Sequence, residues 1–333
     1  MLRNRAGIVL LTALAPSVWG TTYYVTTEYL PPDRPLLAGV LRALPAGLLL
    51  VAITRRLPHG VWWWRSLVLG TLNIGAFFAL LFIAAYRLPG GVAATVGALQ
   101  PLLVAVFSAA LLGDRLTART ALTGVAGVLG VSLLVLRSGA RLDGLGIAAA
   151  LGSAVVMATG VVLSKRWPAP APLLAATGWQ LVAGGLLLLP VALLVEGPPP
   201  APTAGNVLGY GYLALVGAAL AYALWFRGIR ELPAVNVTFL GLLSPVVATV
   251  VGWLALGQEL TAAQAAGAAL ILGALVVAQV RPRAKPLDVG ASGASRTSAG
   301  SSASRTSHVS CASSGGPVQA VAAPRPSGRR FGP

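Results

Sequence analysis

The sequence has very few charged residues. Only 10% of its 333 residues are Asp, Glu, Lys or Arg, whereas an ordinary soluble domain has about 25%. The eight carboxylates are far fewer than the 24 Lys and Arg residues. With 56% hydrophobic residues and a mean hydropathy of +0.80, the composition excludes an ordinary soluble protein and indicates a chain embedded in lipid.

Cysteine and histidine are almost missing, and both absences exclude chemistry. The single cysteine, Cys311, excludes an internal disulfide framework and a cysteine-based metal site. His59 lies in a loop and His308 lies near the C-terminus, so the sequence gives little support for a histidine-dependent membrane hydrolase. No Gly-Lys-Ser/Thr is present, so ATP does not drive this protein through a P-loop. We predict no cofactor and no metal.

The apolar residues form blocks of about 20, the length that an α-helix needs to cross a bilayer. Their continuous hydrophobicity, without alternation, favours helices over a β-barrel. We read the first block as a membrane helix; a signal peptide is the alternative. The ten predicted spans are 6–26, 36–54, 65–85, 89–112, 117–136, 143–164, 172–195, 206–226, 233–257 and 262–280.

One thirty-residue segment occurs twice, 144 residues apart. Residues 88–117 read LPGGVAATVGALQPLLVAVFSAALLGDRLT, and residues 232–261 read LPAVNVTFLGLLSPVVATVVGWLALGQELT. Ten of the thirty positions are identical without a gap. Duplicated membrane segments are the signature of an internally repeated transporter.

The basic residues predict the orientation, because cytoplasmic loops of membrane proteins are rich in Lys and Arg. With ten spans and both termini inside, 14 basic residues lie near the inner face and 4 near the outer face. Each repeat has five spans, so the second copy enters the membrane from the opposite side. The inner loop 113–120 contains Arg115 and Arg119, whereas its counterpart 257–264 has no basic residue, as inversion requires.

These patterns predict an all-α polytopic membrane protein in three parts. Residues 1–140 form the first five-helix repeat, and residues 141–283 form the second, inverted repeat. Residues 284–333 are rich in Ser, Gly, Ala and Arg and are predicted to be a disordered cytoplasmic tail. The net charge of +16 is spread over loops and this tail, so we predict no nucleic-acid partner; tail arginines touching anionic lipid are an alternative.

The ordered set of motifs resembles the drug/metabolite transporter superfamily, specifically its EamA-type ten-helix permeases. The first half carries WGTTYYV, LRALPAGLLL, LPGGVAATVGALQPL and LLGDRLT; the second carries ATGVVLSKR, GWQLVAGGLLLL, ELPAVNVTFLGLLSPV and LGQELT. The resemblance covers about residues 6–280. It implies a secondary transporter with two inverted five-helix repeats, a central cavity and a small organic substrate, and many bacterial members of the family are exporters.

Two prolines mark the middle of equivalent spans. Pro101 and Pro245 lie about twelve residues into their blocks, near the bilayer midplane, and Gly97 and Gly241 stand four residues before them. A helix-interior proline removes a hydrogen bond and crowds the carbonyl four residues back. We predict a helix break at each position, exposing backbone groups to substrate; a simple packing kink is the alternative.

Polar and aromatic side chains inside the spans are candidates for the cavity. Arg42 is the charged residue deepest in a span, and it would attract an anionic group such as a carboxylate or phosphate, unless it reaches the outer surface instead. The other polar and aromatic side chains inside the spans could equally form contacts that hold helices together. The candidate substrate-binding residues are Trp19, Arg42, Asn73, Gln100, Trp179, Gln180, Tyr222, Asn236 and Ser244.

No carboxylate lies deep in a span, although such a group is the usual proton-coupling device. Coupling therefore uses Glu28 near the outer mouth, uses no membrane carboxylate, or is absent. We predict a multi-pass bacterial inner-membrane permease that exports an amino acid or a related metabolite. A lipid-modifying membrane enzyme and a non-transporting sensor or assembly subunit are the alternatives. A homodimer remains open, because small residues in 117–136 and 262–280 permit a close contact with an unidentified partner.

Overall fold

The apolar blocks form a bundle of membrane-length helices. The computed structural model describes residues 2–88, 90–135, 143–257 and 259–280, and over these residues it contains helices and no strand. Ten helical stretches are long and apolar enough to cross a membrane, and each overlaps one block predicted from the sequence. The all-α, ten-span prediction is therefore confirmed. The predicted tail, 284–333, lies outside the described residues.

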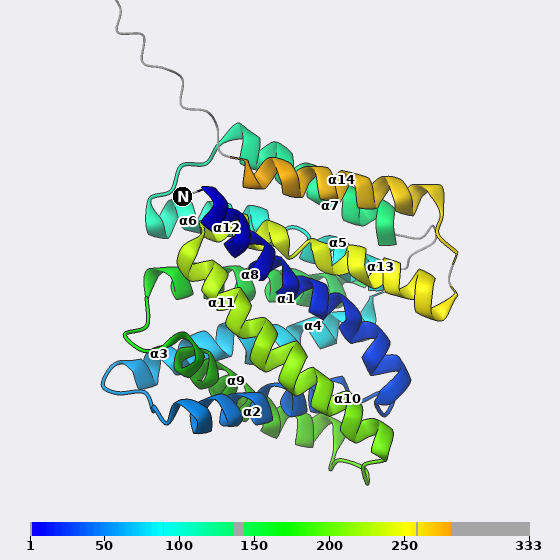
Figure 1. Ribbon diagram of the computed structural model, residues 1–333. Coiled ribbons are helices and arrows are strands. Elements are labelled where there is room, and N and C mark those ends of the chain that lie inside the picture. The colour runs from blue at the N-terminus through cyan, green and yellow to red at the C-terminus, as the bar shows by residue number, and fades with distance from the viewer. Residues whose placement is uncertain (1, 89, 136–142, 258, 281–333) are drawn as a thin grey trace, which may run out of the picture. The chain divides into compact units, whose positions relative to one another are not determined.

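Six spans are single helices (Figure 1). The first, α1, is continuous and packs against helices of the second half of the chain, so it belongs to the bundle. The six are α1 (Leu2–Tyr29), α2 (Pro35–Thr54), α7 (Ala118–Val135), α8 (Gly144–Arg166), α9 (Leu173–Glu196) and α14 (Ala262–Gln279).

The other four spans are interrupted, at equivalent places in the two halves. The third and eighth each contain a π-helical segment, and the fourth and ninth each consist of two helices in succession. The two π-helical segments begin 144 residues apart, the same offset as the duplicated thirty residues. The elements are α3 (Trp62–Gly70), η1 (Thr71–Gly75) and α4 (Ala76–Arg87); α5 (Gly90–Gly97) and α6 (Gln100–Leu112); α10 (Ala204–Ala214), η2 (Leu215–Leu220) and α11 (Ala221–Glu231); and α12 (Ala234–Leu240) and α13 (Leu243–Leu256).

Equivalent helices of the two halves pack against each other, and they run antiparallel. A Cβ on Gly47 of α2 would lie 2.6 Å from the backbone nitrogen of Val182 in α9. Toward the other end of the contact, a Cβ on Gly178 would lie 3.1 Å from the Cβ of Leu50. Residue numbers therefore increase along α2 in the direction in which they decrease along α9, so the two helices are antiparallel. Glycine permits this approach because it has no side chain between the two backbones.

Helices α7 and α14 repeat this arrangement. A Cβ on Gly130 would lie 3.0 Å from the carbonyl oxygen of Gly267, and one on Gly267 would lie 2.8 Å from the nitrogen of Leu134. These glycines therefore have an internal partner. Gly273 of α14 has nothing within 4 Å.

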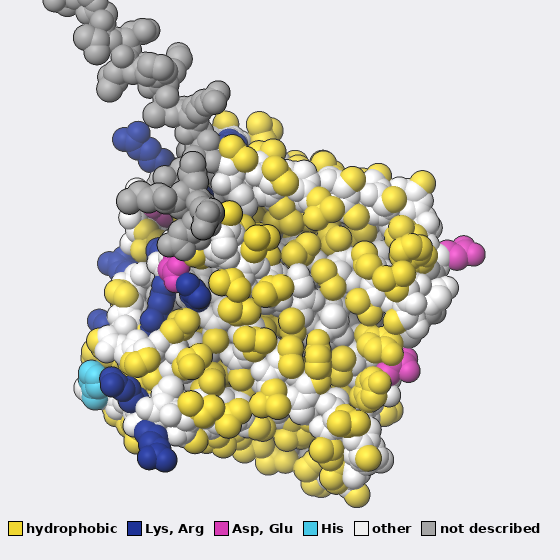
Figure 2. Space-filling model, viewed as in Figure 1, with side chains coloured by type: hydrophobic (Ala, Val, Ile, Leu, Met, Phe, Trp, Pro, Cys, Tyr) yellow, Lys and Arg dark blue, Asp and Glu magenta, His cyan; other side chains and the backbone are white. Residues whose placement is uncertain are grey.

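Basic side chains gather at one end of the bundle, where they bind the carbonyl ends of neighbouring helices. Nζ of Lys165 donates to the carbonyls of Arg230 and Leu232 at the end of α11, at 2.9 Å each. Arg166 donates to the carbonyl of Leu111 in α6 at 2.7 Å. Figure 2 shows most visible Lys and Arg side chains along this edge, with apolar side chains across the middle. Cations at helix C-termini are favoured by the helix dipole.

At the opposite end, a carboxylate performs the complementary role. Glu196 at the end of α9 accepts hydrogen bonds from the backbone nitrogens of Leu36 (2.6 Å) and Leu37 (2.8 Å) in the first turn of α2. An anion there satisfies two otherwise unpaired N–H groups and complements the positive end of the helix dipole.

We expect Glu196→Ala to lower the stability of the protein by about 1–2 kcal/mol, the usual effect of losing an N-terminal cap. The measurement is the thermal unfolding of the purified protein in detergent. Glu259→Ala, which removes an exposed loop carboxylate, is the control and should leave the melting temperature unchanged. Equal melting temperatures for the two variants would show that the cap contributes nothing.

Candidate functional site

Arg42 points into the bundle. Its Nη2 donates a 2.9 Å hydrogen bond to the carbonyl of Gly217 in η2, and its guanidinium carbon lies 5.7 Å from the centre of the Phe78 ring. Phe78 belongs to α4 and Gly217 to the second half of the chain, so Arg42 joins three spans. Arg42 is half-buried as a whole, but its Nε is buried and has no hydrogen-bond partner in the described part of the chain.

Trp19 completes this site from α1. Its indole Nε1 donates to the same Gly217 carbonyl at 3.0 Å, so one backbone oxygen accepts from both Trp19 and Arg42. A carbonyl has two lone pairs and can accept both bonds. The carbonyl belongs to a π-helical turn, a local feature that often occurs at functional sites.

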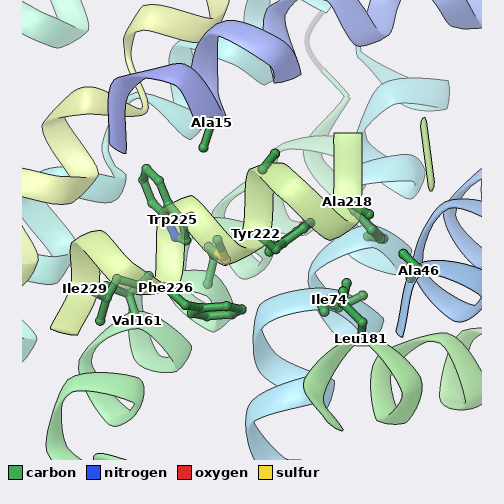
Figure 3. Packing of buried hydrophobic residues seen from close by; sticks show 14 of the residues in the cluster. Ala15, Ala46, Ile74, Val161, Leu181, Ala218, Tyr222, Trp225, Phe226 and Ile229 are labelled. Atoms are coloured by element: carbon green, nitrogen blue, oxygen red, sulfur yellow. The ribbon is translucent and has the colours of Figure 1, made fainter. Parts of the chain in front are cut away.

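Aromatic rings surround the Trp19 side chain. The ring centroids of Tyr222 and Trp225 lie 5.1 Å and 5.2 Å from that of Trp19. Figure 3 shows Tyr222, Trp225 and Phe226 on α11, within the buried cluster that includes Ala15 of α1. We call Trp19, Arg42, Phe78, Tyr222 and the Gly217 carbonyl the arginine site.

A second polar contact occupies the equivalent place in the other half. Nδ2 of Asn73, in η1, donates to Oε1 of Gln180 in α9 at 2.9 Å and to Oγ of Ser164 at 3.1 Å. Asn73 precedes Gly217 by 144 residues. Gln180 lies seven residues into α9, and Arg42 lies seven residues into α2, about 10 Å from the helix start in each case.

The two contacts are thus counterparts. In each, a polar residue of a repeat's second span reaches the π-helical turn in the third span of the other repeat. They differ in chemistry, since the Asn73–Gln180 pair is uncharged and buried, whereas the arginine site has a cation.

We expect Asn73→Ala to destabilise the protein by about 1–3 kcal/mol, because Oε1 of Gln180 is left buried without its donor. Adding Gln180→Leu should restore part of that loss, since both polar partners are then gone. Thermal unfolding of the two single variants and the double variant measures the coupling. Additive losses would mean that the hydrogen bond contributes no coupling energy.

The predicted break positions lie at interruptions of the helices. Helix α5 ends at Gly97, and α6 begins at Gln100, immediately before Pro101. In the second half, Gly241 lies between α12 and α13, with Pro245 in the first turn of α13. Short-range bonds bridge the gaps, from the nitrogen of Leu99 to the carbonyl of Val96 and from that of Leu242 to that of Phe239, both at 3.1 Å.

The first helix packs tightly beside the second break. A Cβ on Gly20 would lie only 2.6 Å from the carbonyl oxygen of Ser244. On the other side of that break, a ring carbon of Trp225 lies 3.7 Å from the position of a Cβ on Gly241. The break in the second half is therefore adjacent to the aromatic rings around Trp19.

Two further candidate residues, Trp179 and Asn236, lie outside both polar contacts and away from the breaks. Trp179 donates from Nε1 to the carbonyl of Arg56 at 2.7 Å, and its ring centroid is 6.3 Å from that of Trp62. Asn236 donates to the carbonyl of Ala278 at 3.0 Å and lines a cavity of about 480 Å³ at the basic end, together with Arg5 and other residues. Trp179 thus ties a loop to α9, and Asn236 ties α12 to α14.

Three participants were not among the candidates from the sequence: Gly217, Phe78 and Trp225. Gly217 contributes a backbone oxygen, which has no signature in the side-chain pattern. Phe78 and Trp225 are ordinary apolar residues of membrane spans until their neighbours are known. The one sequence feature that could have indicated Gly217 is the 144-residue offset between the repeats, because it aligns Gly217 with the polar Asn73.

The arginine site provides hydrogen-bond donors, one positive charge and aromatic surfaces. Within the described residues, no cluster of three or more His, Cys, Asp or Glu could hold a metal ion. The two ion pairs there, Arg87–Asp143 and Arg227–Glu231, are at exposed positions and do not include Arg42. The site can therefore bind an anionic or electron-rich solute.

Comparison with known proteins gives the family. The EamA-like transporter family matches residues 6–136 and again residues 144–279. Protein PecM of Dickeya dadantii is 47% identical over 282 residues, covering 82% of this chain and 95% of PecM. The uncharacterized inner membrane transporter YedA of Escherichia coli K12 is 30% identical over 260 residues, covering 72% of this chain and 84% of YedA.

A solved crystal structure shares the fold, with a TM-score of 0.71 and 24% identity over 82% of this chain and 96% of the other. The sequence resemblance to EamA-type permeases is thus confirmed along the ten spans. The chain belongs to the EamA-like transporter family and is a multi-pass inner-membrane transporter.

Proposed function

We propose that this transporter is a secondary carrier that exports a small organic metabolite, such as an amino acid or a related compound. The observation that carries the proposal is the pair of cross-repeat contacts, Arg42 with the Gly217 carbonyl and Gln180 with Asn73. Each contact joins the two halves through a π-helical turn. Breaking one contact while keeping the other would let one half tilt relative to the other.

Alternating access of two inverted repeats is the proposed mechanism. Inversion is supported by the antiparallel packing of α2 with α9 and of α7 with α14, since equivalent helices then run in opposite directions. Two broken spans, α5–α6 and α12–α13, supply softened turns, near Pro101 and Pro245, about which the halves would move. Gln100 and Ser244 lie at these turns and remain proposed cavity residues, with Trp19, Arg42 and Tyr222.

The inner face is proposed to be the basic end of the bundle, with both termini on that side. Arg5, Arg56, Arg119 and Lys165 all belong to helix ends or loops there, as the positive-inside rule requires. The test is labelling of single cysteines in intact cells, after Cys311→Ser. A cysteine at position 199 should react with an impermeant maleimide, and one at position 59 should not. The reverse pattern would overturn the orientation.

Counterflow in proteoliposomes tests transport itself. The full chain is reconstituted, loaded with each of a panel of unlabelled amino acids and related metabolites, and supplied with the same compound in radiolabelled form. We expect uptake above that of empty liposomes for at least one compound. Export is then assayed as the loss of that compound from cells with and without the gene.

The enzyme alternative makes a different prediction: a membrane enzyme would consume the compound instead of exchanging it unchanged. Recovery of the chemically intact label inside the vesicles supports a carrier. A sensor or assembly subunit would exchange nothing. We retain a homodimer as a further proposal, which size-exclusion chromatography with light scattering would test.

A further inference from the structure

Two buried hydrogen-bond donors beside Trp19 have no acceptor in the described part of the chain. They are Nε of Arg42 and Nε1 of Trp225. Trp19 connects them, because it shares the Gly217 carbonyl with Arg42 and its ring lies 5.2 Å from that of Trp225. Buried donors are nearly always paired, and an acceptor on a bound ligand or a water molecule would pair these two.

Among the described residues, no carboxylate pairs with the positive charge at this site. A guanidinium remains protonated in proteins. The described carboxylates all lie at helix ends or in loops, where Glu196 caps α2 and Asp143 and Glu231 pair with other arginines. A cation in the middle of a membrane protein is strongly disfavoured without an anion. A bound anion would supply both the charge and the acceptor that Arg42 lacks.

The rest of the site is aromatic. The rings of Trp19 and Tyr222 are 5.1 Å apart, and the Phe78 ring lies 5.7 Å from the guanidinium carbon. Aromatic side chains favour flat, apolar partners that stack or pack edge to face with them. A ligand that has an aromatic ring attached to its anionic group would pack well against these aromatic side chains.

We propose that the arginine site binds an aromatic monocarboxylate, an inference that rests on the proposed transport function. The carboxylate accepts from Nε of Arg42, and the aromatic body packs on Trp19 and Tyr222. Nε1 of Trp225 donates to a further acceptor on the ligand, where one is present. Arginine suits this role because its planar group matches a carboxylate.

The test is the thermal unfolding of the purified full chain with matched acid–amide pairs. The probes are phenylacetate with phenylacetamide and indole-3-acetate with indole-3-acetamide, each at the same concentration. A ligand that binds only the folded state raises the melting temperature. We expect at least one acid to raise it by about 3 °C at saturation, a shift typical of such ligand linkage, and its amide to change it by less than about 1 °C.

Substitutions assign the effect to the site. Arg42→Gln should abolish the shift by the acid, and glutamine is tolerable there because Gln180 occupies the equivalent position in α9. Arg42→Lys retains the charge but not the planar group, so it should weaken binding about tenfold. Arg87→Gln, which removes an exposed arginine, is the matched control and should keep the full shift.

Three results overturn the inference: no shift with either acid, equal shifts with acid and amide, or an undiminished shift in Arg42→Gln. If Arg42→Gln does not unfold cooperatively, an unchanged acid affinity in Arg42→Lys overturns it instead. If a neutral compound shows counterflow but neither acid binds, the proposed ligand is wrong and the proposed transport function is retained. Acid binding without counterflow of any compound would support the site and contradict the transport proposal.

Discussion

Replacing Arg42 with alanine is expected to lower the counterflow rate about 100-fold, the effect of losing a charged hydrogen bond to the substrate, while leaving the protein at least as stable as before. The two effects diverge because Arg42 has a buried Nε without a partner and no ion-pair partner among the described residues. Removing an uncompensated buried charge relieves a desolvation cost. Trp19 still donates to the Gly217 carbonyl, so this acceptor keeps a hydrogen-bond donor in the variant.

Initial rates in proteoliposomes and melting temperatures in detergent measure the two effects on the same preparations. Arg42→Lys is the second variant to compare, because it retains the positive charge and should keep a measurable fraction of the transport rate. Gln180→Ala is the contrasting control, since it leaves Nδ2 of Asn73 without one of its two acceptors and should reduce stability. Wild-type transport in Arg42→Ala would remove this residue from the mechanism.

Gly20→Ala is expected to destabilise the protein by about 1–3 kcal/mol, the usual cost of overpacking, and to slow transport more than stability alone explains. The added methyl would lie 2.6 Å from the carbonyl oxygen of Ser244 and 2.7 Å from the Cβ of Val247. Both atoms belong to α13, directly after the break at Gly241–Leu242. Helices α1 and α13 would have to separate, which displaces the break.

Gly7→Ala on the same helix is the matched control. A Cβ there meets nothing within 4 Å, so the melting temperature should stay the same or rise slightly. Melting temperatures and counterflow rates of both variants give the comparison. Equal behaviour of the two would mean that the close approach of α1 to α13 constrains neither folding nor transport.

The individual polar and aromatic candidates include Trp19, Arg42 and Tyr222 of the arginine site, whereas the duplicated segment relates the two halves of the molecule. Its offset of 144 residues also relates η1 to η2, although neither lies within the thirty repeated residues. The proline pattern likewise located both interruptions, with α6 beginning one residue before Pro101 and α13 two residues before Pro245. Two of the candidates, Trp179 and Asn236, instead bind backbone carbonyls away from Arg42.

The sequence by itself determined the number of spans, their approximate positions and the membrane environment. These depend on local properties: about 20 apolar residues per crossing and backbone groups that a helix must satisfy internally. The tertiary structure decided which residues meet. Arg42 finds its acceptor 175 residues away, on the backbone of a glycine in a π-helical turn. Such a contact depends on how helices cross and on where a carbonyl is free, and neither is encoded in the composition of a single span.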